Sequence, residues 1–276
     1  FLDDNSLQHG GVGQILKATT PLGEVLAVKQ MLPPDASADT PAAQRAAAAF
    51  AQDQFEQEYQ VSKALSVLRS VPRVYGRGVI NGTPCMIMEW IEGITLTEAA
   101  RVMAVDDEGR ISPLVAARMG RDIFDILTSM SYVADGFAHR DLSLRNIMVD
   151  TSRQSLAEQV EEGRFELRLI DFGSAVALGS GAAATNTSPA EAPQKHYGAT
   201  PAFASPEMLA GVFAPEAARV SPAVDVYAAG SILYALLEGR PPFNVNDGEE
   251  VPDAAAAYRV KTQFAPGELT GAHGAA

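Results

Sequence analysis

Two short runs of the chain carry oxygen-bearing side chains at spacings that suit the transfer of a phosphoryl group. The first run is His139–Asn146, with the sequence HRDLSLRN, and the second is Asp171–Gly173, with the sequence DFG. Asp141 can accept a proton from an incoming hydroxyl group, Asn146 can bind a metal ion through its side-chain oxygen, and Asp171 can bridge metal ions to phosphates. Phosphoryl transfer depends on positioning and charge neutralisation more than on covalent work by the protein. The sequence therefore predicts a phosphoryl-transfer site with Mg2+, which prefers oxygen ligands.

The two runs stand in a fixed order, and each follows an apolar, strand-like segment. Either run alone would indicate only a charged surface loop, but together they resemble the catalytic loop and the metal-binding loop of the protein kinase family. The resemblance covers the chain from its first strand to about residue 264. It implies an α+β, bilobal fold: a small β-rich N-lobe over residues 1–88, a hinge over 89–95, and a larger helical C-lobe over 96–276, from which we expect the last helices of the family to be missing.

Hydrophobic patterning predicts the elements that position these residues. Residues 1–32 alternate glycine turns with apolar runs, which is typical of a β-hairpin followed by a third strand. A Pro- and Ala-rich stretch over 33–52 predicts an extended linker, and apolar residues at helical spacing predict a helix over 53–68. Residues 72–91 indicate two strands joined at Asn81–Gly82, a pair that favours positive φ. Further segments complete the expected fold: helices over 113–133, 222–238 and 253–264, a polar insertion over 151–164, and a loop over 174–199.

A glycine-rich segment near the start of the chain resembles part of the family's loop over the phosphates of ATP. Glycine lets backbone N–H groups approach a phosphate without hindrance from a side chain. The expected residues are Gly10, Gly11 and Gly13. Gln8 stands in the place of the family's first glycine, which predicts a stiffer loop. By itself this segment would indicate only a hairpin turn.

Lys29, at the end of an apolar run, is similar to the family's third-strand lysine, whose charge meets the α- and β-phosphates of ATP. A buried lysine needs a partner, and the resemblance favours Glu58 over Glu56. An isolated lysine would instead be a solubilising charge on an edge strand. The resemblance also implies an adenine pocket, whose apolar residues would otherwise be ordinary core: Ile15 and Ala27 above and Met148 below, Met88 as the gatekeeper, and Glu89 and Ile91 in the hinge.

Residues around the catalytic loop give conflicting indications of the acceptor. Ser143 stands where the family's serine/threonine kinases commonly carry lysine, and Arg145 stands where its tyrosine kinases commonly carry arginine. Thr200, however, opens a segment that ends in Ser205–Glu207 and resembles the substrate loop of the serine/threonine type. Because Thr200 would lie on the substrate side, near Asp141, we expect transfer to Ser/Thr hydroxyls.

The resemblance assigns supporting roles to other residues. Arg140 would pair with a phosphate on the activation loop and so order that loop. Asp225 would anchor the catalytic loop through backbone N–H groups, and Glu207 would lack the arginine that pairs with it in the family. The candidate phosphate acceptors on the activation loop are Thr185, Thr187, Ser188 and Tyr197, and nothing in the sequence chooses among them.

Composition narrows the classes of partner. The 276 residues carry a formal net charge of −13, which argues against nucleic acid or an acidic membrane surface, since both require a basic face. No apolar stretch reaches the ~18 residues of a membrane helix. A single cysteine, Cys85, excludes an intrachain disulfide and fits a reducing compartment. The composition therefore fits a cytoplasmic or nuclear protein. The resemblance implies ATP and Mg2+ as cofactors, a protein substrate, and an activating kinase or regulatory partner.

Two alternatives stay open beside an active protein kinase. Gln8, Ser143 and Ser62 depart from the family pattern; at the last position, four residues after Glu58, the family usually places a large apolar residue. These departures would fit a kinase-fold scaffold with little turnover. A small-molecule phosphotransferase of related fold usually shows His-Gly-Asp in place of His139–Asp141, so this alternative fits less well.

Overall fold

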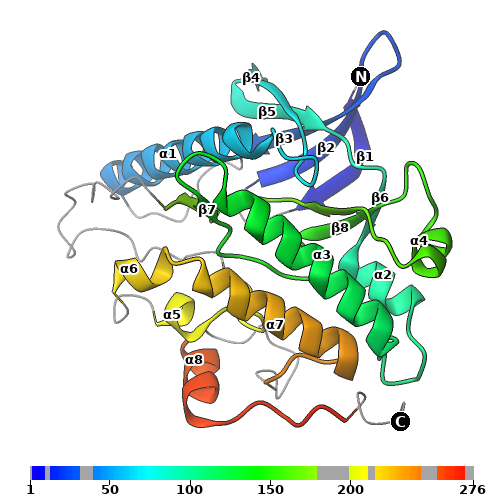
Figure 1. The fold of residues 1–276 in the computed structure, drawn as a ribbon. Coiled ribbons are helices and arrows are strands. Elements are labelled where there is room, and N and C mark those ends of the chain that lie inside the picture. Colours follow the sequence, from blue (N-terminus) through cyan, green and yellow to red (C-terminus); the bar gives the residue numbers. More distant parts are fainter. Residues whose placement is uncertain are drawn as a thin grey trace. The chain divides into compact units, whose positions relative to one another are not determined.

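The chain divides into two compact units, Phe1–Ile91 and Glu92–Ala276, each of which is described by itself. The structure is a computed structural model, and it describes residues 2–9, 13–31, 40–178, 199–210, 215–243 and 254–270 (Figure 1). The first unit is built on a β-sheet and the second on helices, as the α+β prediction requires.

The first unit is built on one five-stranded antiparallel sheet with the strand order β1-β2-β3-β5-β4. Its strands are β1 (Leu2–His9), β2 (Gly13–Thr19), β3 (Val25–Met31), β4 (Val74–Ile80) and β5 (Thr83–Glu89). The predicted hairpin and third strand are confirmed, because β2 pairs with both β1 and β3. The predicted turn between β4 and β5 is also confirmed, with positive φ angles of 52° at Asn81 and 81° at Gly82.

Helix α1 (Pro41–Leu65) packs on this sheet and corrects the prediction for residues 33–68. The linker prediction was wrong for its second half, since the helix begins at residue 41. Thr40 caps the helix by accepting a hydrogen bond from the N–H of Ala43, and Pro41 occupies the first turn. The Ala-rich run that follows has a high helix propensity, which outweighs the effect of the prolines that precede it. Phe55 on α1 packs against Val74 and Met86 of the sheet.

The second unit combines helices with two small sheets. Strands β6 (Gly93–Thr95), β8 (Ile147–Asp150) and β9 (Leu167–Leu169) form one sheet, and β7 (Phe137–Ala138) pairs with β10 (Val176–Ala177). The helices are α2 (Leu96–Val102), α3 (Pro113–Ser131), α4 (Leu156–Glu162), α5 (Pro206–Leu209), α6 (Glu216–Arg219), α7 (Ala223–Glu238) and α8 (Ala254–Gln263). The helices predicted over 113–133, 222–238 and 253–264 are confirmed to within two residues at each end.

Helices α3 and α7 lie side by side and form the centre of the second unit (Figure 1). Gly120 of α3 faces Leu233 of α7 so closely that a Cβ atom at position 120 would lie 2.5 Å from a methyl carbon of Leu233. A side chain at position 120 would therefore require the Leu233 side chain to move. This packing fixes α7, which carries Asp225, within the core of the unit.

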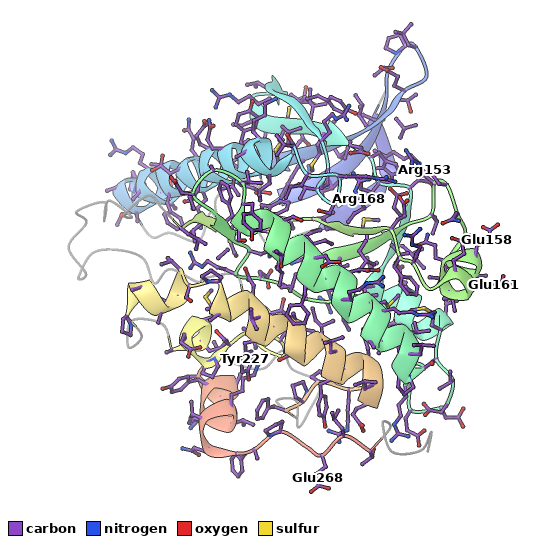
Figure 2. All side chains as sticks on the ribbon, viewed as in Figure 1. Arg153, Glu158, Glu161, Arg168, Tyr227 and Glu268 are labelled. Atoms are coloured by element: carbon purple, nitrogen blue, oxygen red, sulfur yellow. The ribbon has the colours of Figure 1, made fainter. Side chains whose placement is uncertain are left out.

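The polar insertion between β8 and β9 contains a helix that we did not predict. Helix α4 begins with a capping box, in which Ser155 and Glu158 satisfy each other's backbone N–H groups. Figure 2 labels Glu158 at the outer side of the unit. The helix has seven residues, too few for helical periodicity to be recognised in a Glu-rich stretch. No helix in the described part of the chain is both long and apolar enough to cross a membrane.

Candidate active site

In the first unit, the predicted lysine–glutamate pair is present and buried. Lys29 lies in the middle of β3, Glu58 lies on α1, and the Nζ and Oε1 atoms are 2.5 Å apart. Each residue is 2% exposed. Glu56, the competing candidate, points outward and pairs with Arg77 in an exposed ion pair. The choice of Glu58 over Glu56 is therefore confirmed.

Residues expected at the adenine lie on the same face of the sheet as Lys29. Residues directly opposite each other in an antiparallel ladder project from the same face. Ile15 of β2 is paired with Lys29, and Met88 of β5 is paired with Ala27, two residues before Lys29 on β3. The strand pairing therefore gathers these side chains on the face of the sheet that α1 covers.

The remaining nucleotide residues are spread over the chain. Glu89 ends β5, Ile91 is buried at the end of the first unit, and Met148 lies on β8 of the second unit. Gly13 opens β2. Gly10 and Gly11 lie outside the described residues, as do the four candidate phosphate acceptors of the activation loop.

In the second unit, a buried carboxylate on α7 holds the catalytic loop. The two oxygens of Asp225 accept hydrogen bonds from the backbone N–H groups of His139 (2.7 Å) and Arg140 (2.8 Å). Arg140 has a φ angle of 71°, a conformation that costs a non-glycine residue energy and must be held by its surroundings. Burial raises the pKa of Asp225, against the lowering effect of the neighbouring positive charges and the two N–H donors. The predicted anchoring role of Asp225 is confirmed.

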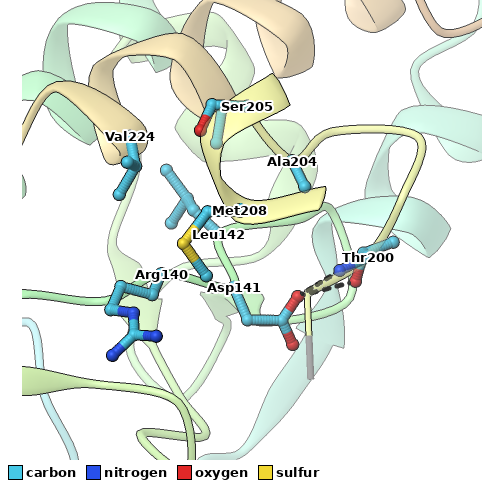
Figure 3. Close-up of a pocket in the computed structure, with 9 residues that line it drawn as sticks. Arg140, Asp141, Leu142, Thr200, Ala204, Ser205, Met208 and Val224 are labelled. Atoms are coloured by element: carbon cyan, nitrogen blue, oxygen red, sulfur yellow. Dashed lines mark hydrogen bonds between the residues drawn. The ribbon is translucent and has the colours of Figure 1, made fainter. Parts of the chain in front are cut away.

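Asp141 is held from two sides. The backbone N–H and the hydroxyl of Thr200 donate to Oδ1 at 2.7 and 2.8 Å (Figure 3). The Nδ2 atom of Asn146 donates to Oδ2 at 3.1 Å and to the backbone carbonyl of Asp141 at 2.8 Å. The prediction that Thr200 lies beside Asp141 is therefore confirmed. The carboxylate has a fixed orientation, with neighbours that come from two separate segments of the chain.

The pKa of Asp141 is raised above its ordinary value. Burial is the largest cause and the negative charge of Asp171 adds to it, while the hydrogen bonds from Thr200 act in the opposite direction. A carboxylate with a raised pKa is a stronger base, and the ideal pKa of a catalytic base lies near the working pH. The direction of the shift therefore suits proton acceptance.

The run Asp171–Gly173 is connected to the catalytic loop by hydrogen bonds of the preceding residue, Ile170, and by a ring contact of Phe172. The N–H of Ile170 donates to the carbonyl of Asn146 at 2.9 Å, and Nε2 of His139 lies 3.2 Å from the carbonyl oxygen of Ile170. The rings of His139 and Phe172 have centroids 5.1 Å apart. Asp171, which lies between Ile170 and Phe172 in the sequence, has a φ angle of 61°. The two runs, 25 positions apart from Asn146 to Asp171 in the printed sequence, thus form one cluster.

The donor set of this cluster fits Mg2+. Because Nδ2 of Asn146 donates to Asp141, its Oδ1 atom is the one available as a ligand, and Asp171 supplies a carboxylate. The mutual repulsion of Asp141 and Asp171 is the kind of electrostatic imbalance that a cation relieves. No group of three or more His, Cys, Asp or Glu residues capable of holding a metal occurs among the described residues. Two oxygen ligands suit Mg2+, which proteins usually bind through one or two side chains together with phosphates and water.

The residues that gave conflicting indications of the acceptor have different environments. Ser143 is 1% exposed, whereas Arg145 is exposed. Ser62 is buried on α1, one turn after Glu58, so the helical phase that we expected is correct.

One buried residue near the site, Lys261, was not among the expected site residues. Lys261 on α8 is buried beside the segment that follows Thr200, and no motif in the sequence singles it out.

Comparison with known proteins agrees with this geometry. The family model of the protein kinase domain matches residues 1–268. A probable serine/threonine-protein kinase of Corynebacterium efficiens is 31% identical over 269 residues, which cover 95% of this chain and 33% of that protein. The serine/threonine-protein kinase PkaA of Streptomyces coelicolor is 32% identical over 166 residues, which cover 60% of this chain and 25% of that protein.

A third relative, the probable serine/threonine-protein kinase PknB of Corynebacterium glutamicum, is 30% identical over 271 residues, which cover 95% of this chain and 34% of that protein. The chain therefore spans between a quarter and about a third of the length of these relatives. The family model, which matches nearly the whole chain, is the basis for assigning the chain to a family. This chain belongs to the protein kinase family.

Proposed function

We propose that this chain is an active protein kinase domain that transfers the γ-phosphate of ATP to Ser/Thr hydroxyls of a protein. The observation that carries the proposal is the arrangement around Asp141, whose carboxylate accepts hydrogen bonds from Thr200 and Asn146 and shares its cluster with Asp171. A base, two oxygen ligands for Mg2+ and a buried lysine are all present. No position that the chemistry needs is filled by an unsuitable residue.

Each residue has a separate task in the proposed reaction. Asp141 accepts the proton of the attacking hydroxyl, and Asn146 keeps the carboxylate in place. Asn146 Oδ1 and Asp171 would hold Mg2+, which when bound neutralises charge on the phosphates. Lys29, fixed by Glu58, would bind the phosphates. The remaining proposed ATP contacts are Gly10, Gly11, Gly13, Ile15, Ala27, Met88, Glu89, Ile91 and Met148.

Two observations support Ser/Thr as the acceptor rather than Tyr. The hydroxyl and N–H of Thr200 both bind the carboxylate of Asp141, so the segment that resembles the serine/threonine type of substrate loop borders the base. The exposed position of Arg145 gives that residue no comparable contact with the base. The relatives' printed names, which all specify serine/threonine-protein kinases, support the same choice.

A scaffold with little turnover is the second candidate. The specific observation in its favour is Ser62, a small polar residue buried one turn after Glu58. A small residue there offers less apolar surface for packing than the family's large one, so that the active arrangement would depend on a partner. Such a protein would still gain stability from Mg-ATP, since a ligand that binds only the folded state raises the melting temperature.

The deciding experiment is transfer of labelled γ-phosphate from Mg-ATP to the protein itself and to myelin basic protein. We expect label on phosphoserine or phosphothreonine, and loss of at least 100-fold in rate in Asp141→Asn, in line with the ~10²–10⁴ typical of a catalytic base. Asn keeps the size of the side chain, and melting curves check that the variant is folded. Labelling that persists undiminished in Asp141→Asn would refute the assignment of the base. Binding of Mg-ATP without any label would support the scaffold.

A further inference from the structure

Lys261 is a buried amine that contacts the segment next to the proposed base. It lies on α8 with 7% of its surface exposed. Its Nζ atom donates to the carbonyl oxygen of Ala204 at 2.6 Å and to that of Ala202 at 3.1 Å. The ring centroids of Tyr227 and Phe243 lie 5.3 and 5.7 Å from the same nitrogen; Figure 2 labels Tyr227 beside α8. Carbonyl dipoles and ring faces thus surround the positive charge.

The segment that Lys261 binds is folded back onto Thr200. The carbonyl oxygen of Thr200 accepts hydrogen bonds from the N–H groups of Phe203 (3.0 Å) and Ala204 (2.9 Å). Thr200 in turn donates to Asp141 through its own N–H and hydroxyl. A continuous chain of contacts therefore runs from the amine of Lys261 through Ala204 and Thr200 to the carboxylate of Asp141.

The same segment forms one wall of the pocket beside the base. Asp141, Thr200, Ala204, Ser205 and Met208 are among the residues that line this pocket (Figure 3). The remaining lining comes from the catalytic loop and from α7, so this wall packs directly against the loop that carries Asp141. The position of the wall therefore affects where an acceptor chain can lie.

We propose that Lys261 is a positioning residue for the protein acceptor: its amine fixes the segment 200–205 and thereby the acceptor's approach to Asp141. This inference rests on the proposed function. An apolar residue of similar length could fill the space without the cost of burying a charge, but it could not bind the two carbonyl groups. Burial lowers the pKa of Lys261 to about 8, which agrees with an amine that is withdrawn from water.

The test compares Lys261→Met with two matched variants. Lys261→Arg keeps a cation and hydrogen-bond donors at the same position. Lys63→Met removes another lysine that donates to a backbone carbonyl, that of Val74 at 3.2 Å, but within the first unit. Initial rates are measured with Mg-ATP and myelin basic protein, and each substrate is varied in turn.

We expect Lys261→Met to lower kcat/KM for myelin basic protein at least tenfold, mainly through KM, with KM for Mg-ATP unchanged within twofold. Lys261→Arg should recover at least a third of the loss, and Lys63→Met should behave as wild type. Equal losses toward ATP and protein, or an unchanged KM for the protein, would overturn the inference. Absence of transfer by the wild type would instead refute the proposed function itself.

A second measurement covers the case in which Lys261→Met does not fold. Hydrogen exchange at the amides of Phe203 and Ala204, both of which donate to Thr200, is compared between wild type and Lys261→Gln. Faster exchange at these two amides, with unchanged exchange in α3, would support the inference. Equal protection in both proteins would contradict it.

Discussion

The two units each bury a lysine, but they satisfy its charge in different ways. In the first unit, Lys29 forms an ion pair with Glu58, and both side chains are almost completely enclosed. In the second unit, Lys261 meets carbonyl oxygens and aromatic rings. Removal of one residue consequently has different results. Loss of Lys29 leaves a buried carboxylate without its partner, whereas loss of Lys261 leaves only neutral carbonyl groups, which cost less to leave unpaired.

The largest expected effect is that of Lys29→Met. The variant should lose nearly all transfer activity and about 3–5 kcal/mol of unfolding free energy, because Glu58 would keep a buried charge. Chemical denaturation and the labelling assay measure the two losses. In the double variant Lys29→Met/Glu58→Leu, stability should return while activity stays absent. If the double variant is no more stable than Lys29→Met, the buried charge is not the cause.

An intermediate effect is expected from the pH dependence of stability. The folded-state pKa of Lys261 is about 8 and the ordinary value is 10.5, so between these values the unfolded chain binds more protons and stability rises with pH. Between pH 8 and 9.5 the gain from this group should be about 1–2 kcal/mol. Tyr227 faces the amine and has a pKa raised by burial and by Glu207, so it stays neutral in this window.

The difference in unfolding free energy between wild type and Lys261→Met isolates this contribution, because the other titrating groups are common to both. It should change by 1–2 kcal/mol in favour of the wild type from pH 8 to 9.5. A flat difference for Lys261→Met would show that its amine is solvated.

The smallest effect is expected for Arg77→Ala. Arg77 pairs with Glu56 on the surface, where the side chains are 54% and 45% exposed. Exposed pairs contribute ~0–1 kcal/mol, so the melting curve should stay close to that of the wild type and transfer activity should be unchanged. A loss as large as that of Lys29→Met would mean that Glu56, not Glu58, carries the important pairing.

Local patterns predicted much of this fold and part of the site. The Asn81–Gly82 turn, the long helices and the anchoring by Asp225 follow from turn chemistry, periodicity and a family motif, and all are confirmed. The predicted start of α1 was wrong because the nearby prolines suggested a linker, whereas the decisive helix signal is one capping residue, Thr40, before an Ala-rich run. The nucleotide contacts remain predictions.

Lys261 could not have been found from the sequence. Its partners are backbone carbonyls at positions 202 and 204, almost 60 residues away, and carbonyl groups leave no trace in residue identity. A sequence motif consists of positions whose side chains must be of one type. A hydrogen bond from a side chain to a backbone carbonyl restricts the type of the donor residue only, because every residue has a carbonyl group. The capping box of α4 is a different case, because both of its residues are visible in the sequence and the helix was missed only because it is too short to show periodicity.

The close approach of α3 and α7 has a consequence for how this chain can diverge. Because a methyl group at position 120 would lie 2.5 Å from a methyl carbon of Leu233, we expect the two positions to vary together in natural sequences. A homologue with alanine at the position of Gly120 should carry a smaller or reoriented residue opposite it. An alignment of homologues should therefore show covariation between positions 120 and 233.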